Sequence, residues 1–340
     1  MRRIRFQILA IVGLALSFGA ARATTHEFYK GKVIRVVVGF AAGGGFDTYA
    51  RTIARHMGRH IPGNPTIIVE NMPGAGSLIA ANHVYRVAKP DGLTMGHFIG
   101  GLFMLQVLGK PGVEFDARKF EYVGVPVKDN TACVFTRASG ITSMEKWFAA
   151  KIPIKIGAVA PGSTTDDVPK VLAAAIGVPL QVVTGYKGTA EIRLAAESGE
   201  VAGGCWGWES IRATWRKGIE TGEVAVVLQT APQPASDLPN VSLAMSFART
   251  DEARQLIRVG IQEAGAITRP FVVTPGTPRD RVQLLRKAFA DTLKDSTFLA
   301  EAQKIKLDID PLSGEELERT IHGLFKLDPV FIARLKEILK

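Results

Sequence analysis

The sequence predicts an α/β protein with parallel sheets and two lobes that enclose a cleft. Short apolar runs rich in β-branched residues alternate with segments in which apolar residues recur every three or four positions. These are the patterns of buried strands and amphipathic helices, and their repeated alternation is typical of parallel sheets covered by helices. The 340 residues are enough for two domains with cores of their own.

Residues 1–23 have the features of a secretory signal. Arginines at positions 2, 3 and 5 precede an apolar segment, 6–20, and Ala21-Arg22-Ala23 matches the small-residue pattern of a cleavage site. The apolar segment is short for a membrane span, and no later stretch reaches the roughly 18 apolar residues that a span needs. We expect export to the periplasm with cleavage after Ala23; an uncleaved anchor is the alternative.

The composition is that of a globular protein with a mild positive charge. Apolar residues make up 46% of the chain and charged residues 22%, which excludes a disordered protein. The formal net charge is +10, and cleavage would remove four of the 42 basic residues, leaving 38 against 32 acidic ones. This balance suits a small anionic ligand, whereas the scattered basic residues form no stripe for nucleic acid.

The first strand–helix unit, residues 33–61, carries a glycine loop that suits an anion. The apolar run Val33–Val38 predicts a buried strand, and an amphipathic helix follows the loop. Three glycines at 43–45 let the backbone turn sharply, and Asp47 stands where a helix N-cap belongs. Unpaired N–H groups and the positive end of the helix dipole favour an anion there. An ordinary turn without a ligand is the alternative.

The next unit resembles a dinucleotide site only superficially. A strand at 66–70 is followed by a turn with Gly74 and Gly76, then a helix at 78–88. Ile79 stands where the dinucleotide fingerprint requires its third glycine, so we expect no nucleotide cofactor. Further strands of this lobe are predicted at 93–99 and 122–127.

A second lobe repeats the opening unit. A strand at 154–160, the loop Pro161–Thr165 and a helix capped by Asp166 follow one another, with hydroxyl groups added to the loop; an ordinary capped turn is the alternative. A third loop, 185–189, places Lys187 beside a helix start, where it complements an anion or simply faces solvent. Other strands are expected at 131–136, 180–183 and 224–230. A proline-rich segment, 232–239, is expected to return the chain to the first lobe, with a strand at 268–273 and helices at 278–293 and 314–340.

These elements divide the chain into a first lobe of residues 24–124 and 230–340 and a second lobe of residues 125–229. The second unit is inserted in the first, which places a cleft between the lobes.

Signatures of catalysis are missing from the sequence. No zinc-protease, serine-hydrolase or phosphate-loop motif is present. His56 and His60 have a metal-binding spacing, but neighbouring arginines disfavour a cation there. Cys133 has no evident base partner, and it either pairs with Cys205 or remains a buried thiol. We predict no catalytic residue, no metal and no cofactor.

Several ordered motifs resemble the tripartite tricarboxylate transporter receptor family, also called the Bug family. From about Tyr29 to the C-terminus the chain carries, in order, Phe40-x-x-Gly43-Gly44-x-x-Asp47, Val69-Glu70-Asn71-x-Pro73-Gly74-Ala75-Gly76, Pro90-Asp91-Gly92-x-Thr94, Tyr186-Lys187-Gly188-Thr189 and Gly199-Glu200-Val201. The resemblance implies a two-lobed periplasmic binding protein of the type II-like, Venus flytrap architecture. It also implies a protein that captures a small organic anion, often a carboxylate, and delivers it to membrane transporter subunits. We expect the chain to be a monomer.

In that family one loop from each lobe pinches a ligand carboxylate, and here these loops are Ala42–Thr48 and Pro161–Thr165. The chain departs from the family pattern at Ala42, at the bulky Phe46 and after Val201, so the family's dicarboxylate preference need not transfer. The aromatic residues hint at an apolar ligand body, although large aromatics are more often core. The candidate ligand-binding residues are Ala42, Gly43, Gly44, Gly45, Phe46, Asp47, Pro161, Gly162, Ser163, Thr164, Thr165, Tyr186, Lys187, Gly188, Trp206 and Trp208.

Two other functions are weighed against a solute receptor. An exported hydrolase would use helix N-terminal N–H groups as oxyanion donors, but no nucleophile–base pair is evident. A dehydrogenase would need the Gly74 loop to hold a pyrophosphate, which conflicts with the incomplete fingerprint and with export.

Overall fold

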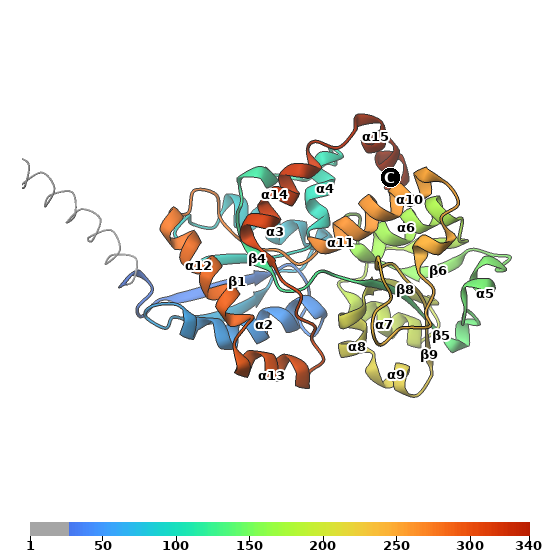
Figure 1. Ribbon diagram of the computed structural model, residues 1–340, viewed down its shortest axis with the longest axis horizontal. Coiled ribbons are helices and arrows are strands. Elements are labelled where there is room, and N and C mark those ends of the chain that lie inside the picture. The colour runs from blue at the N-terminus through green and yellow to red at the C-terminus, as the bar shows by residue number, and fades with distance from the viewer. Residues whose placement is uncertain (1–26) are drawn as a thin grey trace, which may run out of the picture.

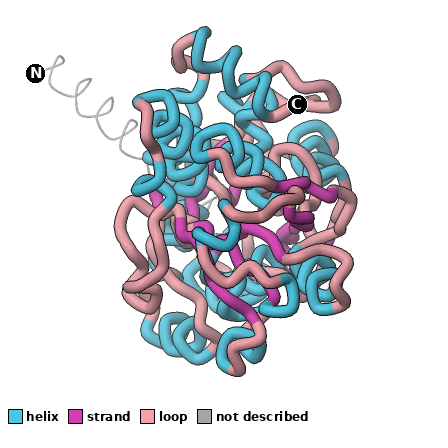
Figure 2. The backbone as a smooth tube through the Cα atoms, turned by 90° about the vertical axis from the view of Figure 1, so that its right-hand side faces the viewer, coloured by secondary structure: helices cyan, strands magenta, loops and turns pink. Residues whose placement is uncertain are grey.

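The computed structural model describes residues 27–340, and the predicted signal and its cleavage site lie outside them. Two lobes lie side by side, each built on its own sheet (Figure 1), with the strands inside a shell of helices and loops (Figure 2). This confirms the predicted two-lobed α/β architecture. No helix within the described part of the chain is long and apolar enough to cross a membrane.

The first lobe is built on a six-stranded sheet with the order β11-β4-β10-β3-β1-β2. Strand β1 is parallel to its neighbours β2 and β3, whereas β10 and β11 are antiparallel to their neighbours. Because side chains alternate along β1, Val36 and Val38 face one apolar core and Val37 faces the other. The strands are β1 (Val33–Val38), β2 (Thr66–Asn71), β3 (Thr94–His97), β4 (Glu121–Val125), β10 (Phe271–Val273) and β11 (Leu312–Ser313).

Helices cover both faces of this sheet. One set packs together around α2, and the other lies on the opposite face with α14 against β4. The first set is α2 (Gly45–Met57), α12 (Arg279–Thr292) and α13 (Ser296–Lys304), and the second is α3 (Leu78–Arg86), α4 (Gly101–Val107) and α14 (Gly314–Leu324).

The second lobe is built on a five-stranded sheet with the order β7-β6-β8-β5-β9. β6 is parallel to β7 and β8, whereas β5 is antiparallel to β8 and β9, so both sheets are mixed rather than purely parallel as predicted. Its strands are β5 (Thr131–Thr136), β6 (Ile154–Gly157), β7 (Leu180–Val183), β8 (Gly203–Gly207) and β9 (Val224–Gln229), and its helices include α5 (Met144–Phe148), α6 (Thr164–Ile176), α7 (Thr189–Glu197), α8 (Trp208–Thr214) and α9 (Arg216–Glu220).

The chain returns to the first lobe later than the predicted position 230. Helix α10 (Asp251–Ile257) and the π-helical turn Arg258–Glu263 pack on α6 of the second lobe because their apolar side chains complete its core; α11 (Ala264–Ala266) follows. The crossing runs through residues 267–270 into β10. The C-terminal helix α15 (Pro329–Ile338) also lies against α6, where Lys170 Nζ donates to the Lys340 carbonyl over 3.2 Å.

The two cysteines form a disulfide, which decides between the alternatives that the sequence left open. Cys133 on β5 and Cys205 on β8 are directly paired in the antiparallel register, with their Cα atoms 4.0 Å apart. The bond therefore joins two neighbouring central strands of the second sheet.

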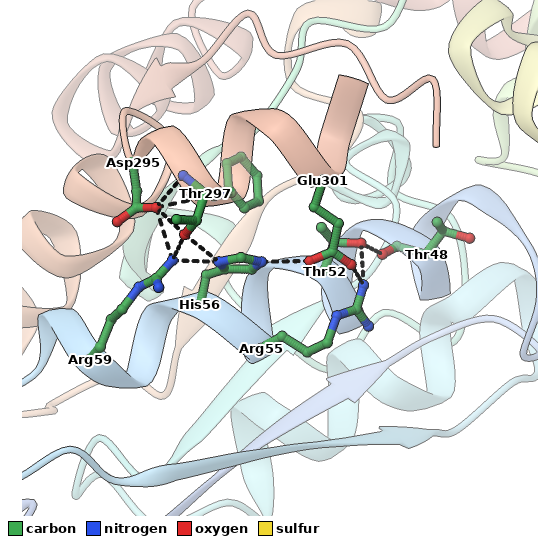
Figure 3. A network of polar contacts seen from close by, with 9 residues as sticks. Thr48, Thr52, Arg55, His56, Arg59, Asp295, Thr297 and Glu301 are labelled. Carbon is green, nitrogen blue, oxygen red and sulfur yellow. Dashed lines mark hydrogen bonds and ion pairs between the residues drawn. The ribbon is translucent and has the colours of Figure 1, made fainter. Parts of the chain in front are cut away.

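His56 on α2 and His60 in the turn after it contact carboxylates on α13 and at its N-cap. The Nε2 atom of His56 lies 2.6 Å from Glu301, and Arg59 donates to the N-cap Asp295 (Figure 3). The Nε2 atom of His60 lies 3.3 Å from Asp295. Within residues 27–340 no group of three or more potential ligand side chains could hold a metal ion. The histidine pair thus serves to attach α13 to α2.

Candidate ligand-binding cleft

A cleft lies between the lobes and is lined from both. About 610 Å³ of space in it is unfilled by atoms, its open mouth included. The lining comes from both lobes and from the two segments that cross between them, 126–130 and 267–270. It consists of Phe40, Ala41, Ala42, Gly44, Gly45, Phe46, Ile99, Asp129, Val159, Ser163, Thr164, Thr165, Gly188, Thr189, Ala190, Glu191, Trp206, Gly207, Ser210 and Arg269.

Three long helices begin at this cleft. Helix α2 starts at Gly45, α6 at Thr164 and α7 at Thr189, and the first residues of all three line the cleft. The first turn of a helix has N–H groups without partners in the helix, and the helix dipole adds partial positive charge. Both lobes therefore direct positive helix ends at the same space.

Asp47 shapes the first loop and does not line the cleft. The N-cap of α2 is Gly44, so Asp47 lies three residues further on and its carboxylate accepts the Gly43 N–H over 3.0 Å. Burial alone would raise the pKa of Asp47, but hydrogen bonds from Arg51, Gly43 and Asn71 outweigh it and hold the pKa below its usual value. The prediction of Asp47 as N-cap was wrong because the N-cap, Gly44, lies three residues earlier.

The second loop repeats this arrangement. Ser163, not Asp166, is the N-cap of α6, and Asp167 accepts the Gly162 N–H over 2.9 Å. The Ser163 hydroxyl donates to the Ala160 carbonyl over 2.6 Å, and Thr165 Oγ1 accepts the Val159 N–H over 3.0 Å. These two hydroxyls are therefore used to hold the loop in shape.

Glycine permits the lobes to touch. A Cβ on Gly45 would lie 2.6 Å from Ser210 Oγ on α8 of the opposite lobe, and one on Gly101 would lie 2.1 Å from the Gly162 carbonyl. Gly162 itself has φ +83° and packs on Leu105 of α4. Gly162 is thus a contact between the lobes, not part of the cleft lining.

The remaining predicted site residues lie elsewhere. Pro161 is exposed and outside the cleft lining, as is Gly43. Tyr186 and Lys187 line a separate hollow beside the Gly74 loop, where Tyr186 donates to Glu200 over 2.7 Å. Trp208 is buried and its indole N–H donates to Asp237 over 3.0 Å. The structure brings together Ala42, Gly44, Gly45, Phe46, Ser163, Thr164, Thr165, Gly188 and Trp206.

A buried charged group on the crossing segments completes the cleft, and sequence reasoning missed it. Arg269, 2% exposed, donates through Nε to Asp129 over 2.6 Å and through Nη2 to Glu209 over 2.5 Å. Its guanidinium also lies over the rings of Phe46 and Tyr49, 4.6 and 5.1 Å from their centres. The sequence did carry a signal for this residue: Arg269 stands inside the apolar run that was predicted as the strand 268–273, and a buried charge requires a partner.

Burial also changes the titration of this group. Burial, followed by the charge of Asp129, raises the pKa of Glu209 to about 8, although Arg269 acts in the opposite direction. The protonated form of Glu209 is therefore favoured more strongly here than in water.

Comparison with known proteins agrees with this architecture. Residues 49–323 match the model of the tripartite tricarboxylate transporter family receptor. The chain belongs to this receptor family. Among curated proteins no sequence matches it closely enough to count as a relative.

Solved structures of similar fold include proteins with bound carboxylates. The periplasmic binding protein BugD is 21% identical, with a TM-score of 0.73 over 91% of this chain and 98% of that one. MatC from Rhodopseudomonas palustris, solved with malate, is 19% identical, with a TM-score of 0.69 over 91% and 99%. A further R. palustris protein, solved with adipate, is 20% identical, with a TM-score of 0.72 over 90% and 97%. At these identities the likeness shows the fold, and family membership shows that this chain is a periplasmic solute receptor.

Proposed function

We propose that the receptor captures a small organic carboxylate in the cleft between its lobes and delivers it to the membrane subunits of a tripartite transporter. The observation that carries the proposal is the convergence of three helix N-termini, from both lobes, on one cleft that also contains Arg269. Similar proteins solved with malate and adipate support the same ligand class. Because each lobe supplies part of the site, the ligand should favour the closed state.

The protein acts without catalysis in this proposal. The Ser163 and Thr165 hydroxyls at the cleft bond to neighbouring loop atoms and to each other, and the described lining residues include no histidine, lysine or cysteine. An activated nucleophile needs a base within hydrogen-bond reach. The exported hydrolase is therefore the less supported alternative. We further propose that the mature chain starts at Thr24 and works as a monomer.

Calorimetry of the mature chain with a panel of carboxylates tests the proposal. We expect saturable binding of one ligand per chain, with the ligand recovered unchanged by mass spectrometry. Release of a hydrolysis product with turnover would support the hydrolase, and a panel that shows no binding at all would contradict the receptor function proposed for this cleft.

A further inference from the structure

Two buried donors on residues that line the cleft have no acceptor in the described part of the chain. Trp206 and Arg269 are each 2% exposed, and neither the indole Nε1 of Trp206 nor the Nη1 of Arg269 has a hydrogen-bond partner among the described residues. The other two guanidinium nitrogens of Arg269, Nε and Nη2, donate hydrogen bonds to Asp129 and Glu209. Indole and guanidinium groups can only donate, and a buried donor without an acceptor is costly. Both donors therefore call for an acceptor on the ligand.

The position of the Trp206 ring is set by small and aromatic neighbours. A Cβ on Gly204 would lie 2.8 Å from Cζ3, so glycine makes room for the six-membered ring, and Trp215 stacks on the indole with ring centres 5.9 Å apart. The Nε1 atom is on the edge of the indole away from Cζ3. This arrangement holds the ring in place at the wall of the cleft, with its N–H unpaired.

The cleft has little positive charge to offer. Among the described lining residues Arg269 is the one basic side chain, and the Asp129 carboxylate beside it balances its charge. Glu191 adds a carboxylate, which accepts the Lys187 N–H over 2.8 Å. Positive potential for an anion therefore comes mainly from the helix N-termini, each worth about half a charge.

Most of the remaining wall is apolar. A carboxylate placed against it would lose its hydration without gaining donors, which is unfavourable. A hydrocarbon chain or aromatic ring there would instead bury apolar surface. The apolar lining consists of Phe40, Ala41, Ala42, Phe46, Ile99, Val159 and the ring of Trp206.

We propose that the ligand is a monocarboxylate with an apolar or aromatic body, bound through the donors of Trp206 and Arg269, and that the cleft discriminates against dicarboxylates. This inference rests on the proposed function and names the ligand class of the same site. The start of α2 lies beside Arg269 Nη1, because a Cβ on Gly45 would lie 3.2 Å from that atom. We therefore assign the Trp206 and Arg269 donors and the α2 N-terminus to one anionic group.

Matched ligand pairs test the ligand class. Calorimetry with straight-chain acids of two to ten carbons compares each monocarboxylate with the dicarboxylate of equal length, such as hexanoate with adipate, and adds benzoate against terephthalate. We expect the monocarboxylate of the best-binding pair to bind at least about tenfold more tightly. Equal or tighter binding of the dicarboxylate would overturn this inference and leave the receptor function standing. Absence of binding by every acid would overturn the receptor function itself.

One tryptophan pair tests the assigned donor. Trp206→Phe replaces the indole with a smaller aromatic ring that lacks the N–H, and we expect the best monocarboxylate to bind about ten to a hundredfold more weakly. Trp208→Phe is the matched control, since its N–H donates to Asp237 outside the cleft lining, and its affinity should stay within about twofold. Thermal melting checks that both variants fold. Equal affinity of folded Trp206→Phe and wild type would remove Trp206 from the site.

Discussion

Adding one methyl group at Gly45 should weaken ligand binding by holding the lobes apart, whereas the same change at Gly44 leaves the contact between the lobes unhindered. A Cβ on Gly45 would lie 2.6 Å from Ser210 Oγ and 2.9 Å from Ser210 Cβ, on the opposite lobe. A Cβ on Gly44 would meet nothing closer than Thr189 Oγ1 at 3.7 Å. Both glycines stand at the start of α2 with no positive φ, so alanine is compatible with the backbone at each.

The size of the effect follows from the overlap. Ordinary contact begins at 3.4 Å, so Ser210 Oγ must retreat by about 0.8 Å for the lobes to close over Gly45→Ala. Overpacking of this kind costs about 1–3 kcal/mol, which corresponds to roughly 5- to 150-fold weaker binding. Separation of the lobes relieves the overlap, so the cost falls on the closed, liganded state.

Calorimetry and thermal melting of both alanine variants provide the assay. Gly45→Ala should lose affinity and keep a melting temperature near that of wild type without ligand, and Ser210→Gly in the same chain should restore binding. Wild-type affinity in folded Gly45→Ala would refute the reasoning, because it would mean that the liganded lobes do not meet at this contact.

Three further predictions concern stability. Replacing Cys133 and Cys205 by serine opens a 72-residue link, so the free energy of unfolding should fall by about 4 kcal/mol in denaturant titrations; an unchanged midpoint would contradict this. Because the pKa of Glu209 is raised to about 8, its protonated form stabilises the folded state. This contribution to the free energy of unfolding is complete at a pH below the usual pKa of glutamate and is lost as pH rises toward 8. Glu209→Gln should flatten the decline of melting temperature between pH 5 and 8, and an equally steep decline would exclude Glu209 as its source. Asp295 caps α13, and its pKa is lowered, first by a hydrogen bond from the Thr297 side chain. The charged carboxylate therefore stabilises the fold at a pH above the usual pKa of aspartate, and this stabilisation is lost as pH falls. Asp295→Ala should melt at a lower temperature than wild type at pH 7 and approach the wild-type melting temperature in acid. A difference in melting temperature that does not change with pH would show that the charge of Asp295 is not its source.

The sequence alone determined the two-lobed α/β architecture and three of the loops that reach the cleft. Hydrophobic periodicity is a local property, so the strand Val33–Val38 and the helix after the glycines were predictable from neighbouring residues. Glycine beside a helix start likewise marked Gly44, Gly45 and Gly188, which line the cleft. The family motifs added the pairing of the two loops.

Only the tertiary structure decided which side chains meet. Arg269, Asp129 and Glu209 come from two crossing segments and a helix, and they are separated by 140 and 60 residues. Their contact depends on how the lobes pack, and no local pattern encodes that. Cys133 and Cys205 were likewise unassigned until strand register placed them opposite each other. Burial then sets the chemistry. An isolated charge in an apolar interior is too costly, so Arg269 must be paired, and burial beside Asp129 raises the pKa of Glu209.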